Sequence, residues 1–310
     1  MSGSLVAVTG AAGFIGRAFC KRAALNGRVV RSFTRASQDD RRDNVAADLA
    51  RVETAELAQA LAGVTTVVHL AGRAHVRGET AATFDAVYRD ANELATRRLA
   101  EASAAAGVRR LIFASTVKVN GEATLRGRPF RVGDAPAPHD AYARSKAAAE
   151  AALFDIAARA SLEIVVLRLP LVYGPGARGN FRSLVDAVRN RRLLPIGAID
   201  NRRSLLGLEN LLDALDATID ARSVDGVHFV ADADSVSTKT LVRAIAGALR
   251  VEPRIVSIPV PLLRIAGALA GRRDAIARLT GSLEVDPTSL TATTGWTPRR
   301  FAIDAATVAA

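Results

Sequence analysis

The 310-residue sequence is poor in cysteine, histidine and aromatic residues. Its single cysteine, Cys20, cannot form an internal disulfide, which excludes a disulfide-stapled secreted scaffold. Cys20 stands between apolar residues of an expected helix, so we expect a buried thiol. The four histidines show no metal-ligand spacing, and no metal site is predicted; they are His69, His75, His139 and His228.

No apolar run is long enough to cross a membrane, which needs about 18 residues. The longest candidate, Ile258 to Ala270, is shorter and is interrupted by Arg264. Residues Met1 to Leu5 lack the basic start and apolar stretch of a signal peptide. We therefore expect a cytoplasmic protein without an integral membrane segment.

Basic residues exceed acidic ones by 42 to 31, a formal net charge of +11. Such an excess suggests an anionic partner, which could be nucleic acid, a lipid surface or a phosphorylated metabolite. No long basic run accompanies an aromatic platform, so a solvated surface of scattered arginines is the favoured interpretation. A nucleic-acid partner is not predicted.

Short apolar runs alternate with alanine-rich segments of helical length through the first half of the chain. This alternation predicts an α/β fold, a Rossmann-type doubly wound parallel sheet with helices on both faces. From about Tyr173 glycine and proline cluster, which predicts a smaller, mostly helical second domain. We expect domains at 1–172 and 173–310, with a later strand near 227–231 returning to the first. The expected strands are Leu5 to Val8, Val29-Val30, Val64 to Leu70, Leu111 to Ala114 and Ile164 to Leu169.

A glycine-rich turn follows the first expected strand. Gly10 permits the tight turn, Gly13 lets the backbone approach a pyrophosphate, and Gly16 lets helix and strand pack closely. The helix that starts near Phe14 and Ile15 then presents free N–H groups to the phosphates. At the first strand-to-helix turn, this pattern predicts dinucleotide binding.

The end of the second expected strand favours NADP over NAD. No acidic residue occurs there before Asp39, whereas Arg35 can pair with a 2′-phosphate, with Thr34 or Ser37 as hydroxyl support. NAD stays possible, because Arg35 could equally be a solvated loop residue. Asp48 and Leu49, after the next short strand, are candidates for contact with the adenine.

A tyrosine and a lysine stand four residues apart where a helix is expected. On a helix Tyr142 and Lys146 share one side, and the ammonium favours the phenolate, so the tyrosine can exchange protons. Ser115 and Thr116 close another apolar strand, and a hydroxyl there can bind the substrate oxygen. These residues suit alcohol–ketone chemistry.

The chain resembles an extended short-chain dehydrogenase/reductase of the nucleotide-sugar epimerase/dehydratase family. The resemblance covers nearly the whole length, and Thr116 stands five residues before Gly121, as the family's catalytic hydroxyl residue does. The motifs that carry it are the glycine turn, His69-Leu70-Ala71-Gly72, Asn92 to Thr96, Ser115-Thr116, Tyr142 to Lys146, Leu167 to Gly176 and Gly295-Trp296-Thr297-Pro298.

The resemblance implies a catalytic set of Thr116, Tyr142 and Lys146. It also implies a nucleoside-diphosphate sugar substrate in the carboxyl-terminal domain, in contact with Ser115, Thr116, Asn180, Pro195 and Arg203. Arg203 would clamp phosphate, unless it is an ordinary surface arginine. The cofactor contacts would be Gly10, Gly13, Phe14, Ile15, Gly16, Arg35, Asp48, Leu49, Leu70, Ala71, Gly72, Asn92, Tyr142 and Lys146.

Departures from the family pattern narrow the chemistry. Dehydratases follow the catalytic threonine with Asp-Glu, but this chain has Val117-Lys118, so elimination is not expected. The sequence around Lys118 resembles that of a UDP-glucose 4-epimerase-like subgroup of bacterial polysaccharide enzymes, which includes 4-ketoreductases. Leu171 replaces an asparagine that touches the sugar in many members.

Three functions remain open, and the first is an NADPH-dependent 4-ketoreductase of a nucleotide-linked, UDP-type hexose. The alternative is a UDP-sugar 4-epimerase that uses the same residues without net cofactor turnover. A remote alternative is an NADP-sensing binding protein with a basic surface. By analogy with the family, the segments Thr83 to Gly107 and Tyr142 to Arg159 would pair in a homodimer.

Overall fold

The computed structural model describes residues 4–35, 44–74 and 81–309, and the chain divides into two compact units. The first unit holds Met1–Val119, Pro136–Arg168 and Leu215–His228. The second holds Asn120–Ala135, Leu169–Ala214 and Phe229–Ala310. The division therefore does not follow a single boundary near residue 172, because the chain leaves the first unit three times and returns to it twice.

Two sets of contacts explain this division of the chain. Segment 120–135 joins the second unit because its backbone pairs with the chain near residues 282–286, at Thr124 with Ser282 and at Phe130 with Val285. Segment 215–228 belongs to the first unit because Arg110 donates to the backbone carbonyl of Thr218 at 2.6 Å. Neither pairing is visible as a periodic pattern in the sequence.

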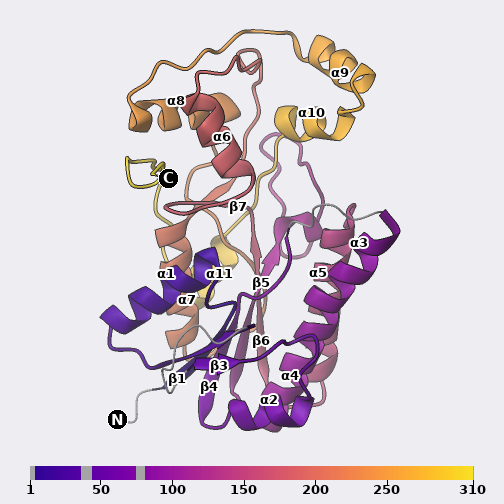
Figure 1. The fold of residues 1–310 in the computed structure, drawn as a ribbon, viewed down its shortest axis with the longest axis vertical. Coiled ribbons are helices and arrows are strands. Elements are labelled where there is room, and N and C mark those ends of the chain that lie inside the picture. The colour runs from indigo at the N-terminus through magenta and orange to yellow at the C-terminus, as the bar shows by residue number, and fades with distance from the viewer. Residues whose placement is uncertain (1–3, 36–43, 75–80, 310) are drawn as a thin grey trace. The chain divides into compact units, whose positions relative to one another are not determined.

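A seven-stranded sheet with the order β3-β2-β1-β4-β5-β6-β9 forms the centre of the first unit (Figure 1). The pairs β1–β2, β2–β3, β1–β4 and β4–β5 are parallel. Each expected apolar run became a strand, with ends shifted by a few residues. The strands are β1 Leu5–Thr9, β2 Val30–Thr34, β3 Asn44–Ala46, β4 Val64–His69, β5 Arg110–Thr116, β6 Glu163–Leu169 and β9 Gly226–Phe229.

The helices follow the alanine-rich segments. One π-helix, η1 (Arg89–Leu94), interrupts a long helical stretch, and a short 3₁₀ turn, η2 (Val117–Val119), follows β5. The α-helices that include first-unit residues are α1 Phe14–Leu25, α2 Thr54–Ala60, α3 Ala81–Tyr88, α4 Ala95–Ala105, α5 Ala141–Ala157 and α7 Leu208–Asp220. The others are α6 Asn180–Arg189, α8 Thr238–Leu249, α9 Val260–Leu269, α10 Arg273–Thr280 and α11 Thr288–Thr294.

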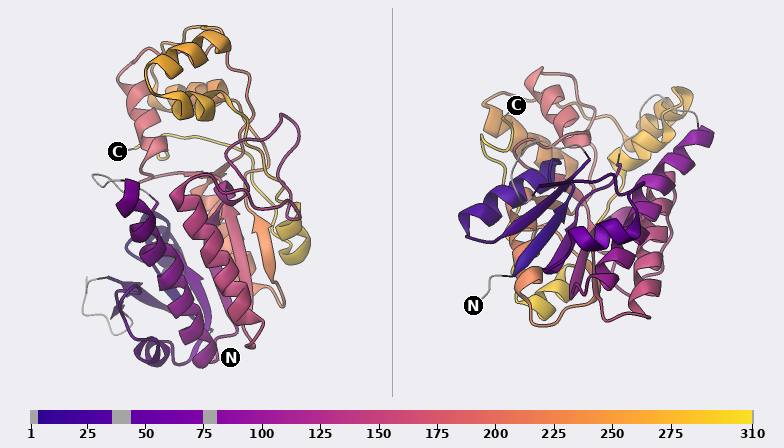
Figure 2. Two further views of the ribbon diagram at one scale, coloured as in Figure 1. Left: turned by 90° about the vertical axis from the view of Figure 1, so that its right-hand side faces the viewer. Right: turned by 60° about the horizontal axis from the view of Figure 1, so that its bottom comes forward.

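Helices cover both faces of the sheet (Figure 2). On one face α2, α4 and α5 bury Leu57, Leu99 and Leu153 against strand residues such as Val67 and Phe113. On the other face α1 and α7 lie together and are joined by an ion pair between Arg22 and Asp216 at 3.1 Å. The central strands β1, β4, β5 and β6 are buried nearly throughout, which explains why their sequences are mostly apolar, whereas β2 and β3 are only partly buried.

The strand order reverses between β1 and β4, which makes this edge of the sheet the expected ligand site. The chain runs from β1 outward to β2 and β3, then crosses back to place β4 on the other side of β1. Because these strands are parallel, their carboxyl ends at Thr9, Thr34 and His69 share one edge. Ligands of doubly wound folds bind at such a reversal.

The second unit contains a two-stranded parallel sheet, β7 Leu171–Tyr173 and β8 Leu205–Gly207, with helices around it. The buried Asp232 accepts hydrogen bonds from the Tyr173 hydroxyl at 2.7 Å and from the Asn210 amide at 2.8 Å. It also accepts from the Gly207 N–H at 2.9 Å. These three bonds offset the cost of burying a carboxylate and tie both strands to the chain beyond β9.

Two expectations about single features can be compared with the structure. Cys20 on α1 is half-buried rather than fully buried, and its Sγ lies 3.8 Å from the Ser32 Oγ; burial raises the pKa of this thiol. Trp296 is buried in the second unit, as expected for a packing residue. Among the described residues, no helix has the length and hydropathy of a membrane span.

Arg110 provides a test of this fold. It is fully buried at the start of β5, pairs with Glu163 at 2.6 Å, and also donates to Ala221 O at 2.9 Å. We expect Arg110→Ala to lower the free energy of unfolding by about 3 kcal/mol, because it strips the last carbonyls of α7 and Glu163 of their partner. Urea denaturation measures this loss.

The neighbouring Arg109 is the matched control. Its side chain is 46% exposed and lies 3.5 Å from the same Glu163 carboxylate. Arg109→Ala should cost less than about 1 kcal/mol, as is usual for an exposed pair. Equal losses in the two variants would show that Arg110 does not anchor α7.

Candidate functional site

The glycine turn after β1 forms a backbone cradle at the reversal point of the sheet. Gly10 has φ 68°, and a Cβ there would lie 2.7 Å from the backbone nitrogen of Ala71 at the end of β4. A Cβ on Gly16 would lie 2.2 Å from the Gly10 carbonyl oxygen. Both positions therefore require glycine, for the turn and for close packing of α1 on the sheet.

Gly13 differs from the other two glycines. Its backbone is ordinary, with φ −76°, and a Cβ there would meet only the Gly10 oxygen at 3.0 Å. Gly13 is the N-cap of α1, and no side chain caps that helix, so the first turn at Phe14 and Ile15 keeps N–H groups for a ligand. This arrangement fits the pyrophosphate of a dinucleotide.

Arg17 is a candidate contact that the sequence reasoning missed. Its guanidinium donates to the Ala12 carbonyl at 2.7 Å, which places a cation on the glycine turn. An arginine four residues after Gly13, on the first turn of the helix, was the available signal.

Arg35 is exposed directly after β2, and the structure shows no carboxylate paired with it in the described segments. Asp48 lies after the adjacent β3, where it accepts from the Ala50 N–H at 3.1 Å and faces Arg51 at 3.9 Å. Leu49 is buried. Because β2 pairs with β3, these candidates share the edge that carries the glycine turn. Ser37 and Asp39 lie outside the described residues, as does His75.

His69 at the end of β4 is a structural residue with every polar atom bonded. The Thr96 hydroxyl donates to the Asn92 carbonyl, so it accepts from His69 Nε2 at 2.9 Å. His69 Nδ1 then accepts from the Thr9 hydroxyl at 2.6 Å, and Thr9 accepts from the Ala71 N–H. Burial, followed by the charge of Lys146, lowers the pKa of His69 to about 3. The imidazole is therefore neutral and joins β1, β4 and η1.

Asn92 on η1 holds the chain after β4 in place. Its Oδ1 accepts from the Arg73 N–H at 2.8 Å, and its Nδ2 donates to Arg73 O at 3.1 Å and to the Ser145 hydroxyl at 2.9 Å. A Cβ on Gly72 would lie 3.0 Å from Asn92 Oδ1. Asn92 therefore connects Gly72 and Arg73 to α5 rather than leaving its amide free for a ligand.

Lys146 on α5 is buried, and its ammonium lies near Gly72, beside the residues that Asn92 holds. It is 4% exposed, and its Nζ lies 3.9 Å from the centre of the Phe113 ring. A Cβ on Gly72 would also lie 3.9 Å from this nitrogen. Within the described part of the chain, the ammonium makes no hydrogen bond or ion pair. Burial lowers the pKa of Lys146 to about 7, although the nearby Glu150 acts to raise it.

Glu150 and Arg168 form a buried ion pair behind the lysine, with 2.5 Å between Arg168 Nη2 and the carboxylate. The Ser115 hydroxyl donates to the same carboxylate. This bond leaves Thr116, which accepts from the Lys118 N–H at 3.3 Å, as the hydroxyl whose proton has no assigned acceptor. The pair was not predicted, although Glu150 follows Lys146 by one helical turn.

Lys118, the residue that departs from the dehydratase pattern, joins the end of β5 to the start of α5. Its Nζ lies 2.6 Å from an oxygen of Asp140, and Asp140 also caps α5 by accepting from the Ala143 N–H at 2.7 Å. This ion pair brings the turn after Thr116 to the first turn of α5, which carries Tyr142. The substitution therefore has a structural role here.

Tyr142 is held as a neutral phenol by the protein alone. Its ring packs 5.8 Å from the ring of Tyr88. Burial raises the pKa of Tyr142, and the charges of Asp140 and Tyr88 raise it further. Lys146 is not among the groups that shift the pKa of Tyr142, so the expectation that it favours the phenolate stays a prediction.

The candidate substrate residues of the second unit are separate from one another in the contacts that the structure describes. Asn180 is exposed at the start of α6, and Pro195 is half-buried beside Leu194, which donates to Arg254 O at 2.8 Å. Arg203 is half-buried, and burial lowers its pKa. Its guanidinium donates to the carbonyls of Arg278 and Gly281 at 2.8 and 3.1 Å.

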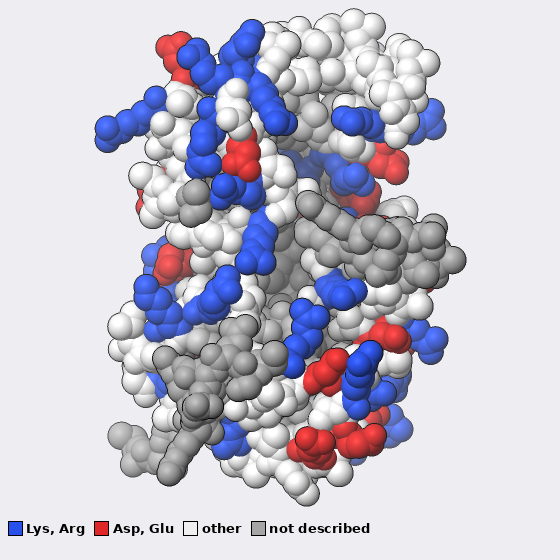
Figure 3. Space-filling view, in the orientation of Figure 1, with Lys and Arg blue, Asp and Glu red and all other residues white. Residues whose placement is uncertain are grey.

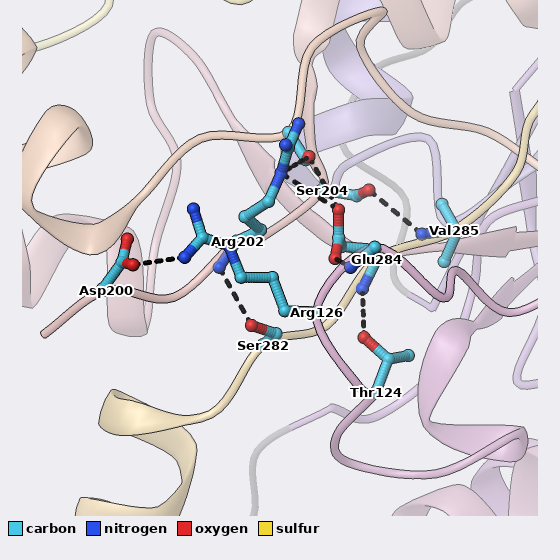
Figure 4. Close-up of polar contacts among 10 residues, drawn as sticks. Thr124, Arg126, Asp200, Arg202, Ser204, Ser282, Glu284 and Val285 are labelled. Carbon is cyan, nitrogen blue, oxygen red and sulfur yellow. Dashed lines mark hydrogen bonds and ion pairs between the residues drawn. The ribbon is translucent and has the colours of Figure 1, made fainter.

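Arg203 differs from its neighbour Arg202 in its partners. Arg202 pairs with Glu284 at 3.2 Å, and Arg126 pairs with Asp200 (Figure 4). Arg203 makes no ion pair with any described carboxylate, so its charge is available to an anion. Among the described residues, no three His, Cys, Asp or Glu side chains gather closely enough to hold a metal ion.

Comparison with known proteins gives one family match and several similar proteins. The NAD dependent epimerase/dehydratase family matches residues 6–231. A UDP-glucose 4-epimerase of Vibrio cholerae is 38% identical over 94% of this chain and 90% of its own. A 2-alkyl-3-oxoalkanoate reductase of Stenotrophomonas maltophilia is 29% identical over 81% of this chain and 78% of its own.

The solved structure of MoeE5 in complex with UDP-glucuronic acid and NAD is similar in fold. It has a TM-score of 0.76 and 28% identity, and the match covers 96% of this chain and 95% of that one. The likeness therefore extends over both units of the chain.

The buried ammonium predicts a pH dependence of stability. Because the pKa of Lys146 falls from 10.5 to about 7 on folding, the unfolded chain binds more protons between these values. Stability then rises with pH through this window, by about 1.4 kcal/mol per unit of pKa difference at most. Between pH 7 and pH 10, the free energy of unfolding of the wild type should rise by at least about 2 kcal/mol more than that of Lys146→Met.

Lys21→Met is the control, because Lys21 is exposed on α1. Its curve of unfolding free energy against pH should run parallel to that of the wild type. A parallel curve for Lys146→Met as well would mean that the ammonium is not buried as described.

Proposed function

Because the chain belongs to the NAD-dependent epimerase/dehydratase family, we propose that it is a 4-epimerase of a UDP-linked hexose. The observation that carries the proposal is the buried Lys146 ammonium, which stands between Gly72 and Phe113 without a partner among the described residues. An unpaired buried cation is costly unless a ligand satisfies it. The ribose hydroxyls of a nicotinamide dinucleotide at the adjoining glycine turn fit this need.

The catalytic groups would be Thr116, Tyr142 and Lys146. The bound dinucleotide supplies the acceptance and return of hydride at C4. Thr116 donates a hydrogen bond to the sugar oxygen O4, and Tyr142 takes the proton from O4 on oxidation and gives it back on reduction. Since the phenol is protonated in the protein alone, it is ready to donate to a 4-keto oxygen. The opposite transfer needs the positive charge of protonated Lys146 nearby.

The second unit would hold the nucleoside diphosphate. Arg203 is the candidate for phosphate because it is half-buried, is fixed by two carbonyls and lacks a carboxylate partner among the described residues. Asn180 at the first turn of α6 and Pro195 remain candidates for the rest of the nucleotide. The 38% identity to a protein named UDP-glucose 4-epimerase supports uracil as the base.

A second candidate function is reduction of a 4-keto sugar with net consumption of NADPH. One observation favours it, the exposed Arg35 after β2, where an NAD enzyme usually has an acidic residue. The reductase among the similar proteins also fits this alternative. A binding protein without catalysis has no support beyond the surface charge.

The proposal also includes a cytoplasmic homodimer formed through the region of α4 and α5. Phe154, which is 36% exposed on α5, lies in this region.

Purified protein should interconvert UDP-glucose and UDP-galactose, or their N-acetyl derivatives, without net oxidation or reduction of the dinucleotide. Tyr142→Phe should lower kcat by about 100-fold or more, with dinucleotide binding retained, because it removes the proton carrier. Product analysis and absorbance at the reduced nicotinamide band measure both quantities.

Tyr88→Phe is the matched control, since Tyr88 packs on Tyr142 and its hydroxyl reaches only Ala74 O at 3.5 Å. It should change kcat by no more than about threefold. Stoichiometric use of NADPH with a 4-keto sugar would replace the epimerase proposal by the reductase one. No activity on any nucleotide sugar would defeat both.

The dinucleotide can be identified through Arg35. If Arg35 pairs with a 2′-phosphate, Arg35→Asp should raise the Kd for NADPH about tenfold or more while the Kd for NADH changes little. Titration of protein fluorescence with each dinucleotide gives both constants. Arg159→Asp, which makes the same charge change at an exposed residue just after the end of α5, is the control. Equal weakening of NADPH and NADH by Arg35→Asp would argue for NAD.

A further inference from the structure

The helices α9 and α10 form a hairpin with little of its surface buried. On α9 only Leu263 and Gly267 are buried, and α10 has no buried residue. The two helices pack closely, because a Cβ on Gly267 would lie 2.4 Å from Ile276 Cγ1, and the Arg272 N–H donates to Gly267 O at 2.7 Å. The hairpin is thus an ordered element with a large exposed face.

The exposed face of α9 is apolar. Leu262, Ile265 and Leu269 are 56%, 58% and 86% exposed. Spacings of three and four residues place them on one side of the helix. In Figure 3 the surface over α9, at the upper right, shows no charged side chains, and basic side chains gather below it. Three large aliphatic side chains together on a helix, each more than half exposed, call for a partner.

The hairpin is rich in arginine. Residues 258–281 contain Arg264, Arg272, Arg273 and Arg278 but only one acidic residue, Asp274. The first three make no ion pair within the described part of the chain, and Arg278 faces Glu122 at 3.9 Å. The hairpin therefore combines an apolar stripe with unneutralised positive charge.

We propose that the α9–α10 hairpin docks on the surface of an anionic lipid bilayer. A helix with an apolar stripe and arginines beside it lies in the membrane interface, with the stripe among the acyl chains and the guanidinium groups at the phosphates. With 10 residues, α9 is too short to cross the bilayer. The protein is then a peripheral membrane protein held by one corner of its second unit.

A second copy of the chain is a poorer occupant of this face. A twofold interface places the same patch on both sides, so the arginines of one hairpin would face those of the other. Asp274 alone is insufficient to neutralise them. A bilayer that contains anionic lipids supplies both an apolar layer and a layer of negative charge.

Vesicle sedimentation of the full-length protein tests the proposal. Protein should pellet with vesicles of phosphatidylcholine that contain roughly 30% phosphatidylglycerol, should bind pure phosphatidylcholine weakly, and should be released as salt rises from about 0.1 to 0.5 M. The triple variant Leu262→Ser, Ile265→Ser, Leu269→Ser should bind at least about tenfold more weakly. The triple variant Arg264→Gln, Arg272→Gln, Arg273→Gln should lose binding to a similar extent.

Matched variants separate the hairpin from general surface properties. Leu25 on α1 is 79% exposed, and Leu25→Ser removes an equally exposed leucine elsewhere. Arg51→Gln, Arg159→Gln, Arg300→Gln removes the same total charge away from the hairpin. Both controls should keep binding within about twofold of the wild type. Circular dichroism confirms that each variant is folded.

The chemistry proposed above does not enter this inference, and Tyr142→Phe should bind vesicles normally. Equal binding by the hairpin variants and their controls would overturn it. Failure of the wild type to bind anionic vesicles would also overturn it. If the triple serine variant of α9 then changed the oligomeric state, the face would belong to a second copy of the chain.

Discussion

The chemistry proposed for the first unit depends on the burial of one ammonium group, that of Lys146. A cation in a dry environment is costly, and the fall of the Lys146 pKa to about 7 expresses that cost. Glu150 limits it from one helical turn away, but its carboxylate is itself neutralised by Arg168. The lysine is therefore held close to the point where it can carry or release a proton near neutral pH. Burial, Asp140 and Tyr88 all raise the pKa of Tyr142, so its ionisation depends on a nearby positive charge such as that of protonated Lys146.

The polar residues around this ammonium act mainly by fixing positions. The chain of bonds from Thr9 through His69 and Thr96 to Asn92 O joins two strand ends to η1, and the Asn92 side chain then holds Arg73 and Ser145. Each donor in the chain has one acceptor, which is what a buried network requires. The neutral imidazole thereby helps to hold the glycine turn, the end of β4 and α5 in fixed positions. Such rigid support is what a site needs if hydride and proton are to move over short distances.

The fold was predictable from the sequence because its central strands are buried. The run Leu111 to Ala114 is apolar along its whole length, and the glycine turn marks where β1 ends. The division into units was less predictable. Arg110 begins β5 as a buried charge, which apolar patterning cannot find, and its contacts with Thr218 O draw segment 215–228 into the first unit. Segment 120–135 pairs with the chain more than a hundred residues later.

Contacts between distant segments were equally hard to predict in the candidate site. Tyr142 and Lys146 were found because a helix makes their spacing meaningful, whereas Glu150 with Arg168 and Lys118 with Asp140 are pairs between separate elements. Ser115 and Thr116 are adjacent in a strand and so point to opposite faces, yet only the structure shows that Ser115 is bonded to Glu150. A sequence names candidate hydroxyls, and the bonds of their neighbours decide which of them is free.

The net charge of +11 is spread over arginines that pair with carboxylates and arginines that do not, and the two groups have different effects. Many arginines face carboxylates, as Arg22 faces Asp216 and Arg202 faces Glu284, and these contribute little to any attraction for anions. Arginines without such partners in the described chain include Arg203 and, in the α9–α10 hairpin, Arg264, Arg272 and Arg273. Arg203 is fixed by the carbonyls of Arg278 and Gly281, at the carboxyl end of that same hairpin. The guanidinium proposed for the diphosphate and the hairpin proposed for the bilayer are therefore joined by two hydrogen bonds.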